Sequence, residues 1–224
     1  MRIKETLVAG EYYHVFNKSI AGFRIFNGNQ EYERMIHAIE YYQLKNTPCS
    51  LRYFFRLIQS NGSSNFEDRF SIFRDQKDRW VKIIAYCLMP THVHFLLQQL
   101  VDQGISTFMG NILNSYARYF NTKHKRMGPL WAGRFKNVLI KTDDQFMHLT
   151  RYIHLNPTSG GLVKSPEDWL YSSYREYLNQ NMPARKLCYK ENVIDIPPHE
   201  YKKFVEDQKG YQMELERIKH LLLV

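Results

Sequence analysis

Four stretches of the chain have the alternation or the apolar run that is typical of β-strands. Residues 11–19 alternate between apolar and polar positions. Residues 80–87 and 92–98 are apolar and are separated by the turn-prone residues 89–91, so they predict an antiparallel hairpin. Residues 135–141 resemble a further strand. The pattern therefore predicts a sheet of four short strands.

Three longer stretches repeat apolar residues every three or four positions, which predicts helices. They cover residues 29–44, 105–120 and 142–156. Thr142 is the expected N-cap of the third helix, because acidic residues follow it in the first turn. Pro157 is expected to end that helix, since proline cannot donate a backbone hydrogen bond.

The order of these elements predicts an α+β domain with an antiparallel or mixed sheet and helices on one face. Residues 46–79 are the least regular part of the chain. We interpret them as an insertion or an irregular excursion from the core, with a loop at residues 61–65. Residues 1–178 are expected to form the domain. Residues 179–224 are expected to be a proline-containing linker and a helical tail with an apolar stripe.

Positive charge is concentrated in one window of the sequence. The formal net charge is +9, and residues 103–142 contain no Asp or Glu, where the average composition predicts about four. Cations and aromatic rings are interleaved there, a combination suited to phosphates and unpaired bases. Nucleic acid is therefore the expected partner. The alternative is a solvated basic face with core aromatics beneath it.

Cysteine content and hydropathy favour a cytoplasmic protein. The three cysteines, Cys49, Cys87 and Cys188, are too scattered for a disulfide framework or a cysteine zinc site. No segment approaches the roughly 20 apolar residues that a membrane helix needs. We therefore expect reduced thiols and no membrane partner.

Two histidines in the hairpin are candidate metal ligands. His92 and His94 are two positions apart on a predicted strand, so they share a face, and Val93 and Phe95 lie on the other. Such a pair can bind one metal ion but is not diagnostic alone, and a third ligand is needed.

The third predicted helix supplies a candidate for that ligand. Tyr152 and Asn156 are four residues apart, which places them on one helical face. A carboxamide oxygen can complete a divalent metal site, and a phenol can act as a nucleophile. The alternative is that Asn156 only caps the helix and that Tyr152 is a half-buried aromatic.

Three motifs in order resemble a known family. They are MPTHVHFLL (residues 89–97), GPLWAGRFK (128–136) and RYIHLNP (151–157). Together they resemble the single-tyrosine HUH transposases, and within them the branch of REP-associated tyrosine transposases. The resemblance spans most of residues 12–177.

The resemblance implies a fold, a site and a reaction. The fold would be the ferredoxin-like antiparallel sheet, with helices packed on it, of the HUH endonucleases. By resemblance, His92, His94 and Asn156 would be the metal ligands and Tyr152 the nucleophile. The reaction would be cleavage and rejoining of single-stranded or hairpin DNA through a 5′-phosphotyrosine. Mg²⁺ or Mn²⁺ is the implied metal; two imidazoles would also suit zinc.

The remaining assignments concern DNA contacts and helpers. Residues expected to contact nucleic acid are Arg118, Lys123, Lys125, Arg126, Trp131, Arg134 and Lys136. Trp131 could instead anchor the core. His148 and His154 are candidates for a base that assists ionisation of Tyr152; the alternative is that they have no catalytic role. Two rival functions stay open, a non-catalytic DNA-binding regulator and a hydrolase that activates water on a histidine-bound metal. A homodimer is an alternative to a monomer.

Overall fold

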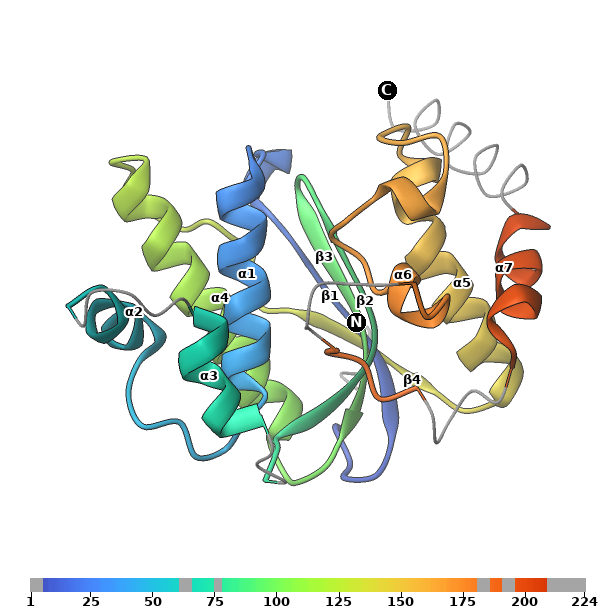
Figure 1. The fold of residues 1–224 in the computed structure, drawn as a ribbon, viewed down its shortest axis with the longest axis horizontal. Helices are drawn as coiled ribbons and strands as arrows, with labels where there is room; N and C mark the ends of the chain where they lie inside the picture. The colour runs from blue at the N-terminus through green and yellow to red at the C-terminus, as the bar shows by residue number, and fades with distance from the viewer. Residues whose placement is uncertain (1–5, 61–65, 75–77, 181–185, 191–195, 209–224) are drawn as a thin grey trace.

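The computed structural model describes residues 6–60, 66–74, 78–180, 186–190 and 196–208. Four of these ranges contain all of its helices and strands (Figure 1). In chain order the elements are β1 (Tyr12–Lys18), a 3₁₀ turn (Ile20–Gly22), α1 (Asn29–Tyr42), α2 (Leu51–Ser60), α3 (Phe66–Arg74), β2 (Val81–Met89), β3 (His92–Gln99), α4 (Gly104–Lys123), β4 (Lys136–Ile140), α5 (Asp143–Ser159), a 3₁₀ turn (Pro166–Asp168), α6 (Tyr174–Tyr177) and α7 (Pro198–Glu206).

The four strands form one antiparallel sheet in the order β2-β3-β1-β4. This is the ferredoxin-like strand order, so the predicted fold class is confirmed. β1 lies between β3 and β4, and its register sets Phe16 opposite His94. The first strand of the chain is thus a direct neighbour of the strand that carries the histidine pair.

Helices cover both faces of the sheet, so the expectation of helices on one face alone is wrong. α1 and α4 pack on the face to which Val93, Phe95 and Leu97 point. α5 packs on the opposite face, against Leu96 and neighbouring residues of β2. Figure 1 shows α1 and α4 on one side of the strands and α5 on the other. Successive side chains of a strand point to opposite faces of the sheet, and here both faces carry apolar side chains. Each face is therefore covered by helices, which bury these side chains.

The interpretation of residues 46–79 as irregular is wrong for most of their length. α2 and α3 lie there, and they pack on α1 through Phe54, Phe66 and Phe70, which are buried. Tyr41 of α1 contacts Phe54 and Phe70, with ring centroids 5.3 and 5.7 Å apart. Aromatic burial thus holds these helices in place. The loop expected at residues 61–65 lies outside the described residues.

The edge of the sheet at β2 is covered by the chain that follows α5. Leu88 N donates to Tyr171 O at 2.9 Å, and Trp169 Nε1 donates to Leu88 O at 3.0 Å. Farther along β2, Tyr189 N donates to Ile83 O at 2.9 Å. These contacts satisfy backbone groups that an exposed edge strand would leave unpaired. The apolar stripe expected in the helical tail lies outside the described residues.

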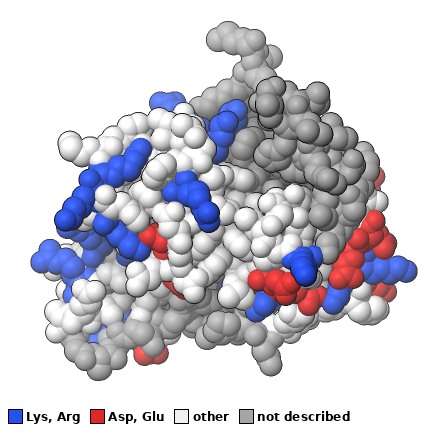
Figure 2. Space-filling model, turned by 90° about the horizontal axis from the view of Figure 1, so that it is seen from above, with Lys and Arg blue, Asp and Glu red and all other residues white. Residues whose placement is uncertain are grey.

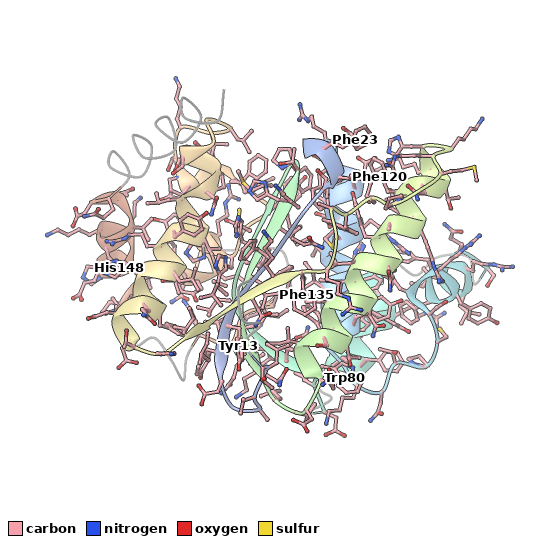
Figure 3. All side chains as sticks on the ribbon, turned by 180° about the vertical axis from the view of Figure 1, so that it is seen from behind. Tyr13, Phe23, Trp80, Phe120, Phe135 and His148 are labelled. Atoms are coloured by element: carbon pink, nitrogen blue, oxygen red, sulfur yellow. The ribbon has the colours of Figure 1, made fainter. Side chains whose placement is uncertain are left out.

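One end of the molecule is rich in exposed Lys and Arg. Figure 2 shows these side chains gathered over the end that α2 and α4 occupy in Figure 1, whereas acidic side chains gather over the opposite end. At that basic end Phe23 and Phe120 meet edge to face, with centroids 6.0 Å apart (Figure 3). Within the described part of the chain, no helix is long and apolar enough to cross a membrane.

Candidate active site

The histidine pair lies on β3 and faces α5, as its spacing predicts. His92 and His94 are two positions apart on the strand, and their ring centroids are 5.0 Å apart. Leu96, the next residue on the same face, belongs to the core that α5 covers. His94 is buried and His92 is partly exposed, so the pair sits at the border between that core and solvent.

Tyr152 and Asn156 approach the histidines from α5. The ring centroids of His94 and Tyr152 are 5.6 Å apart and nearly perpendicular. Tyr152 and Asn156 also line, together with His92 and Arg24, a pocket of about 400 Å³. His92 and His94 of β3 therefore lie close to Tyr152 and Asn156 of α5, although the two elements are about sixty residues apart in the sequence.

Helix α5 continues through Pro157, so the expected stop at that residue is wrong. The helix ends at Ser159, and Gly160 N donates to Asn156 O at 2.8 Å. A proline removes only one backbone hydrogen bond, and Leu155, Pro157 and Thr158 are all buried, which keeps the turn packed. Asn156 is thus a helical residue and not a terminal cap. The N-cap is Thr142, as predicted, and its hydroxyl accepts from Gln145 N at 3.2 Å.

The carboxamide of Asn156 is oriented by its own helix. Its Nδ2 donates to the carbonyl oxygen of Tyr152 at 3.0 Å. Because that carbonyl can only accept, the nitrogen must occupy this position, and Oδ1 lies on the other arm of the amide. The orientation of Oδ1, the atom that could bind a metal, is therefore fixed by the four-residue spacing between Asn156 and Tyr152.

Both histidines are held through the same ring nitrogen. His92 Nδ1 lies 2.9 Å from Thr91 Oγ1, and His94 Nδ1 lies 3.0 Å from His14 Nε2. A metal ion would consequently be bound through Nε2 of each ring. Metal-binding histidines are commonly oriented in this way by a partner on the second nitrogen.

His14 is a residue of the site that we did not expect from the sequence. It lies on β1, and its ring is stacked on that of His94 with centroids 5.2 Å apart. Tyr152 lies edge-on to it at 6.1 Å. Burial lowers the pKa of His14 to about 4, so the ring is neutral at physiological pH and its Nε2 can accept a hydrogen bond from His94 Nδ1.

Cations but no acids line the pockets beside the pair. Arg24 lines the pocket shared with Tyr152, and Lys18 lines a second pocket, of about 290 Å³, that includes His92 and His94. Neither pocket has an Asp or Glu among its described lining residues, and the described residues contain no group of three His, Cys, Asp or Glu side chains that could together hold a metal ion. The donors present are two imidazoles and one amide, without a carboxylate. Such a site keeps the full charge of a bound cation and favours an anionic substrate.

The two candidate helper histidines lie elsewhere on α5. His154 is fully buried between Tyr201 Oη (2.7 Å) and Ser173 Oγ (2.8 Å), and burial lowers its pKa to about 3. It ties α5 to α7 and to the segment along β2. His148 lies beside Arg151, near the outer end of α5 (Figure 3). Neither lines the pocket of Tyr152 and Asn156, although His148 lies one turn before Tyr152 and lines another pocket together with His14.

The residues expected to contact nucleic acid are divided between the two sides of α4. Arg118 and Lys123 line a groove with α1 and α2, and Trp131 and Arg134 line a larger groove of about 790 Å³ beside residues 128–135. Trp131 also donates from Nε1 to Leu113 O at 3.0 Å, so it is anchored to the core.

The other three expected contacts line neither of these grooves. Arg126 donates to Pro129 O at 2.7 Å, and Lys125 and Lys136 are exposed. The seven residues thus do not form one patch.

The sheet and its site define a class of protein. A ferredoxin-like sheet that presents a His-x-His pair beside a tyrosine-bearing helix is the arrangement of the HUH proteins. A family model described as "Transposase IS200 like" matches residues 55–156, a span that includes both histidines, Tyr152 and Asn156. This match covers just under half of the chain, and over that span the chain is similar to the IS200-like transposases.

Individual relatives agree with this assignment. A protein of Haemophilus influenzae named as a REP-associated tyrosine transposase is 26% identical over 148 residues, which are 59% of this chain and 84% of the relative. The REP-associated tyrosine transposase of Escherichia coli K12 is 26% identical over 107 residues, 47% of this chain and 62% of that protein.

A solved structure has the same fold. It is a REP-associated tyrosine transposase bound to a REP hairpin, with a TM-score of 0.51 at 16% sequence identity, and the match covers 88% of this chain and 94% of the other. The similarity to this family supports a DNA-processing enzyme.

Proposed function

We propose that this protein is a metal-dependent transposase that cleaves and rejoins single-stranded DNA through a 5′-phosphotyrosine on Tyr152. The observation that carries the proposal is the convergence of Tyr152 and Asn156 of α5 on His92 and His94 of β3. A tyrosine in this setting is close to a potential metal ion and still partly exposed to a substrate.

The donor set fits a divalent cation. His92, His94 and Asn156 would hold a Mg²⁺ or Mn²⁺ ion, which when bound supplies Lewis-acid polarisation of the scissile phosphate. The rings of His92 and His94 would bind such an ion through Nε2, because Nδ1 of each lies within hydrogen-bond distance of Thr91 or His14. We further propose that His14 is a positioning residue that accepts a hydrogen bond from Nδ1 of His94 and fixes this orientation.

The chain's own side chains account for the rest of the chemistry. The phenol oxygen of Tyr152 forms a bond to phosphorus while the bond from phosphorus to the upstream 3′ oxygen breaks. The phenol loses a proton and the departing 3′ oxygen gains one, so the step is balanced without a further reagent. Arg24 and Lys18 beside the histidines would bind neighbouring phosphates of the strand.

Reversal of this step explains the rejoining. The free 3′ hydroxyl of a second strand attacks the phosphotyrosine and releases Tyr152, so no external energy source is consumed. Hairpin-forming DNA is the proposed substrate, because the related structure is that of a transposase bound to a REP hairpin. The proposed catalytic domain comprises residues 1–178, and α7 of the following segment packs against α5.

A covalent adduct distinguishes this proposal from its rivals. The protein is incubated with a labelled hairpin oligonucleotide with single-stranded flanks and Mn²⁺, then denatured and separated by electrophoresis. We expect a label that migrates with the protein, and its loss in Tyr152→Phe while DNA binding is retained. A water-activating hydrolase would cleave equally well with Tyr152→Phe, and a binding-only regulator would give neither adduct nor cleavage.

A further inference from the structure

A groove on the far side of the sheet from Tyr152 has the chemistry of a phosphate site. It has a volume of about 470 Å³ and lies between α1, α2 and α4. Arg34 of α1, Arg52 of α2 and Arg118 of α4 line it, together with the amide side chains of Asn111 and Asn114. No Asp or Glu is among its described lining residues. Figure 1 shows these three helices together, on the other side of the strands from α5.

Arg34 is held in place by aromatic rings from the other two helices. Its guanidinium carbon lies 4.3 Å from the ring centroid of Phe55 on α2 and 5.3 Å from that of Tyr119 on α4. Its Nε is buried and has no hydrogen-bond acceptor within the part of the chain that the structure describes. Burial lowers its pKa to about 10, so the group is still charged at neutral pH. A charged donor that is held in this way can form a hydrogen bond to an anionic acceptor without first being ordered.

The other arginines of the groove keep their charge available. Arg52 and Arg118 are exposed, and no described carboxylate forms an ion pair with either. The nearby acid, Glu31, is already engaged by Lys123 at 2.6 Å and His124 at 3.1 Å. Lys123 at the rim is therefore neutralised, whereas the three arginines are not. Three guanidinium groups without a described counter-ion favour phosphate oxygens, which they can bind in bidentate fashion.

We propose that this groove binds backbone phosphates of the DNA substrate, outside the segment that is cleaved. The proposal deepens the proposed function, because it assigns a second contact to the same DNA. The proposal also assigns a role to α2, since this helix supplies both Arg52 and the ring of Phe55 that packs on Arg34. DNA bound at both places passes from the α5 face of the sheet to the α1 and α4 face.

The test measures how DNA affinity depends on salt. Each phosphate contact contributes about 0.7 to 0.9 to the slope of log K against log salt concentration. For the double variant Arg52→Ser, Arg118→Ser we therefore expect the slope for a flanked hairpin oligonucleotide to fall by about 1.5. Affinity at about 0.15 M salt is expected to fall roughly tenfold. Both positions are exposed, so the fold should be unaffected.

A matched control lies one turn along α2. Arg56 has the same charge and is also exposed, but it does not line the groove. Arg56→Ser should leave the slope unchanged. Equal slopes for Arg56→Ser and the double variant would overturn the proposal. A third variant, Arg34→Gln, should lower the slope further in the double-variant background, and an unchanged slope would contradict a role for Arg34.

Two further arms separate this proposal from related explanations. Inorganic phosphate at millimolar concentration and constant ionic strength should not compete with DNA; competition lost in the double variant would indicate a small-anion site instead and overturn the assignment to DNA. The control variant Arg56→Ser should form the Tyr152 adduct at the wild-type rate. If wild type forms no adduct but the slopes differ, the proposed reaction fails and the groove stands. If the adduct forms but the slopes are identical, the reaction stands and the groove fails.

Discussion

The two faces of the sheet carry groups of different kinds. On the α5 face lie His14, His92, His94 and Tyr152, which are neutral or aromatic groups in close contact. On the α1 and α4 face lies a groove with three arginines and no described acid. The first arrangement depends on short distances and orientation, and the second on net charge.

This difference separates two expected phenotypes. Geometry at a metal site changes the rate of a chemical step when it is disturbed by about an ångström or less. Charge on a distant groove acts on affinity and is screened by salt. Variants on the α5 face should therefore alter adduct formation at saturating DNA, and variants on the opposite face should alter only the affinity.

The largest effect is expected at Asn156. Asn156→Ala removes the amide oxygen that we assign to the metal, so the rate of adduct formation should fall by about 100-fold or more at saturating DNA. This loss exceeds the roughly 10- to 100-fold that is typical when a group that only orients a metal ligand is removed. DNA affinity, measured by fluorescence anisotropy, should change less than about twofold.

Asn114 in the arginine groove provides the matched control for Asn156. Asn114→Ala makes the same substitution at an exposed helical position on the other face. Its adduct rate at saturating DNA should equal that of wild type. A similar loss of rate in both variants would contradict the separation between the faces.

His14 is expected to have the next largest effect. His14→Phe keeps an aromatic ring against His94 but removes the acceptor for Nδ1. In a Tyr152→Phe background with bound DNA, we expect Mn²⁺ affinity, followed by the electron paramagnetic resonance of free Mn²⁺, to fall about 10- to 100-fold. His14→Gln, which restores an acceptor, should recover part of the loss. Unchanged Mn²⁺ affinity in His14→Phe would rule out the positioning role while leaving that of Tyr152 intact.

Acid stability should report on the α5 face. Burial lowers the pKa of His154 from 6.5 to about 3, so the unfolded chain binds a proton that the folded chain excludes between these values. Stability therefore rises with pH across this window, and His154 should contribute about 2 kcal/mol less at pH 5 than at pH 7, at 1.36 kcal/mol per pKa unit.

Denaturant unfolding at the two pH values measures this contribution. The difference between pH 5 and pH 7 should be smaller by about 2 kcal/mol in His154→Gln than in wild type. Because other groups titrate equally in both proteins, an identical difference in the two would show that His154 is not kept neutral by the fold.

The smallest effect is expected for Lys123. In the sequence Lys123 and Arg118 look equivalent, since both lie in the same acid-free window. The structure pairs only Lys123 with Glu31. Lys123→Gln should therefore weaken DNA binding about twofold or less, and Arg118→Gln several-fold, in one anisotropy titration. Equal losses would mean that the ion pair does not neutralise Lys123.

The sequence was sufficient for those parts of the fold and site that depend on local spacing. Alternation predicted the face of β3 that carries His92 and His94, and the four-residue spacing predicted that Tyr152 and Asn156 share a face of α5. Which elements lie side by side is not a local property. The motifs that resemble the HUH transposases supplied that link, and the structure brings the residues together.

The features that were missed depend on pairing and packing between distant segments. His14 joins the site because β1 pairs with β3, and alternation within residues 11–19 does not reveal a strand's neighbour. Pro157 stays helical because its turn is buried, which outweighs one lost hydrogen bond. α2 forms on aromatic contacts with α1, so the groove that it completes was also invisible in the sequence.

The central claim is that Tyr152 becomes covalently linked to DNA, and peptide mapping of the adduct tests it most directly. The adduct formed with Mn²⁺ and hairpin DNA is digested with nuclease and protease, and the modified peptide is sequenced by mass spectrometry. We predict a 5′-linked nucleotide phosphate on Tyr152 alone. A modification on another residue, or cleaved DNA with no modified peptide, would contradict the account.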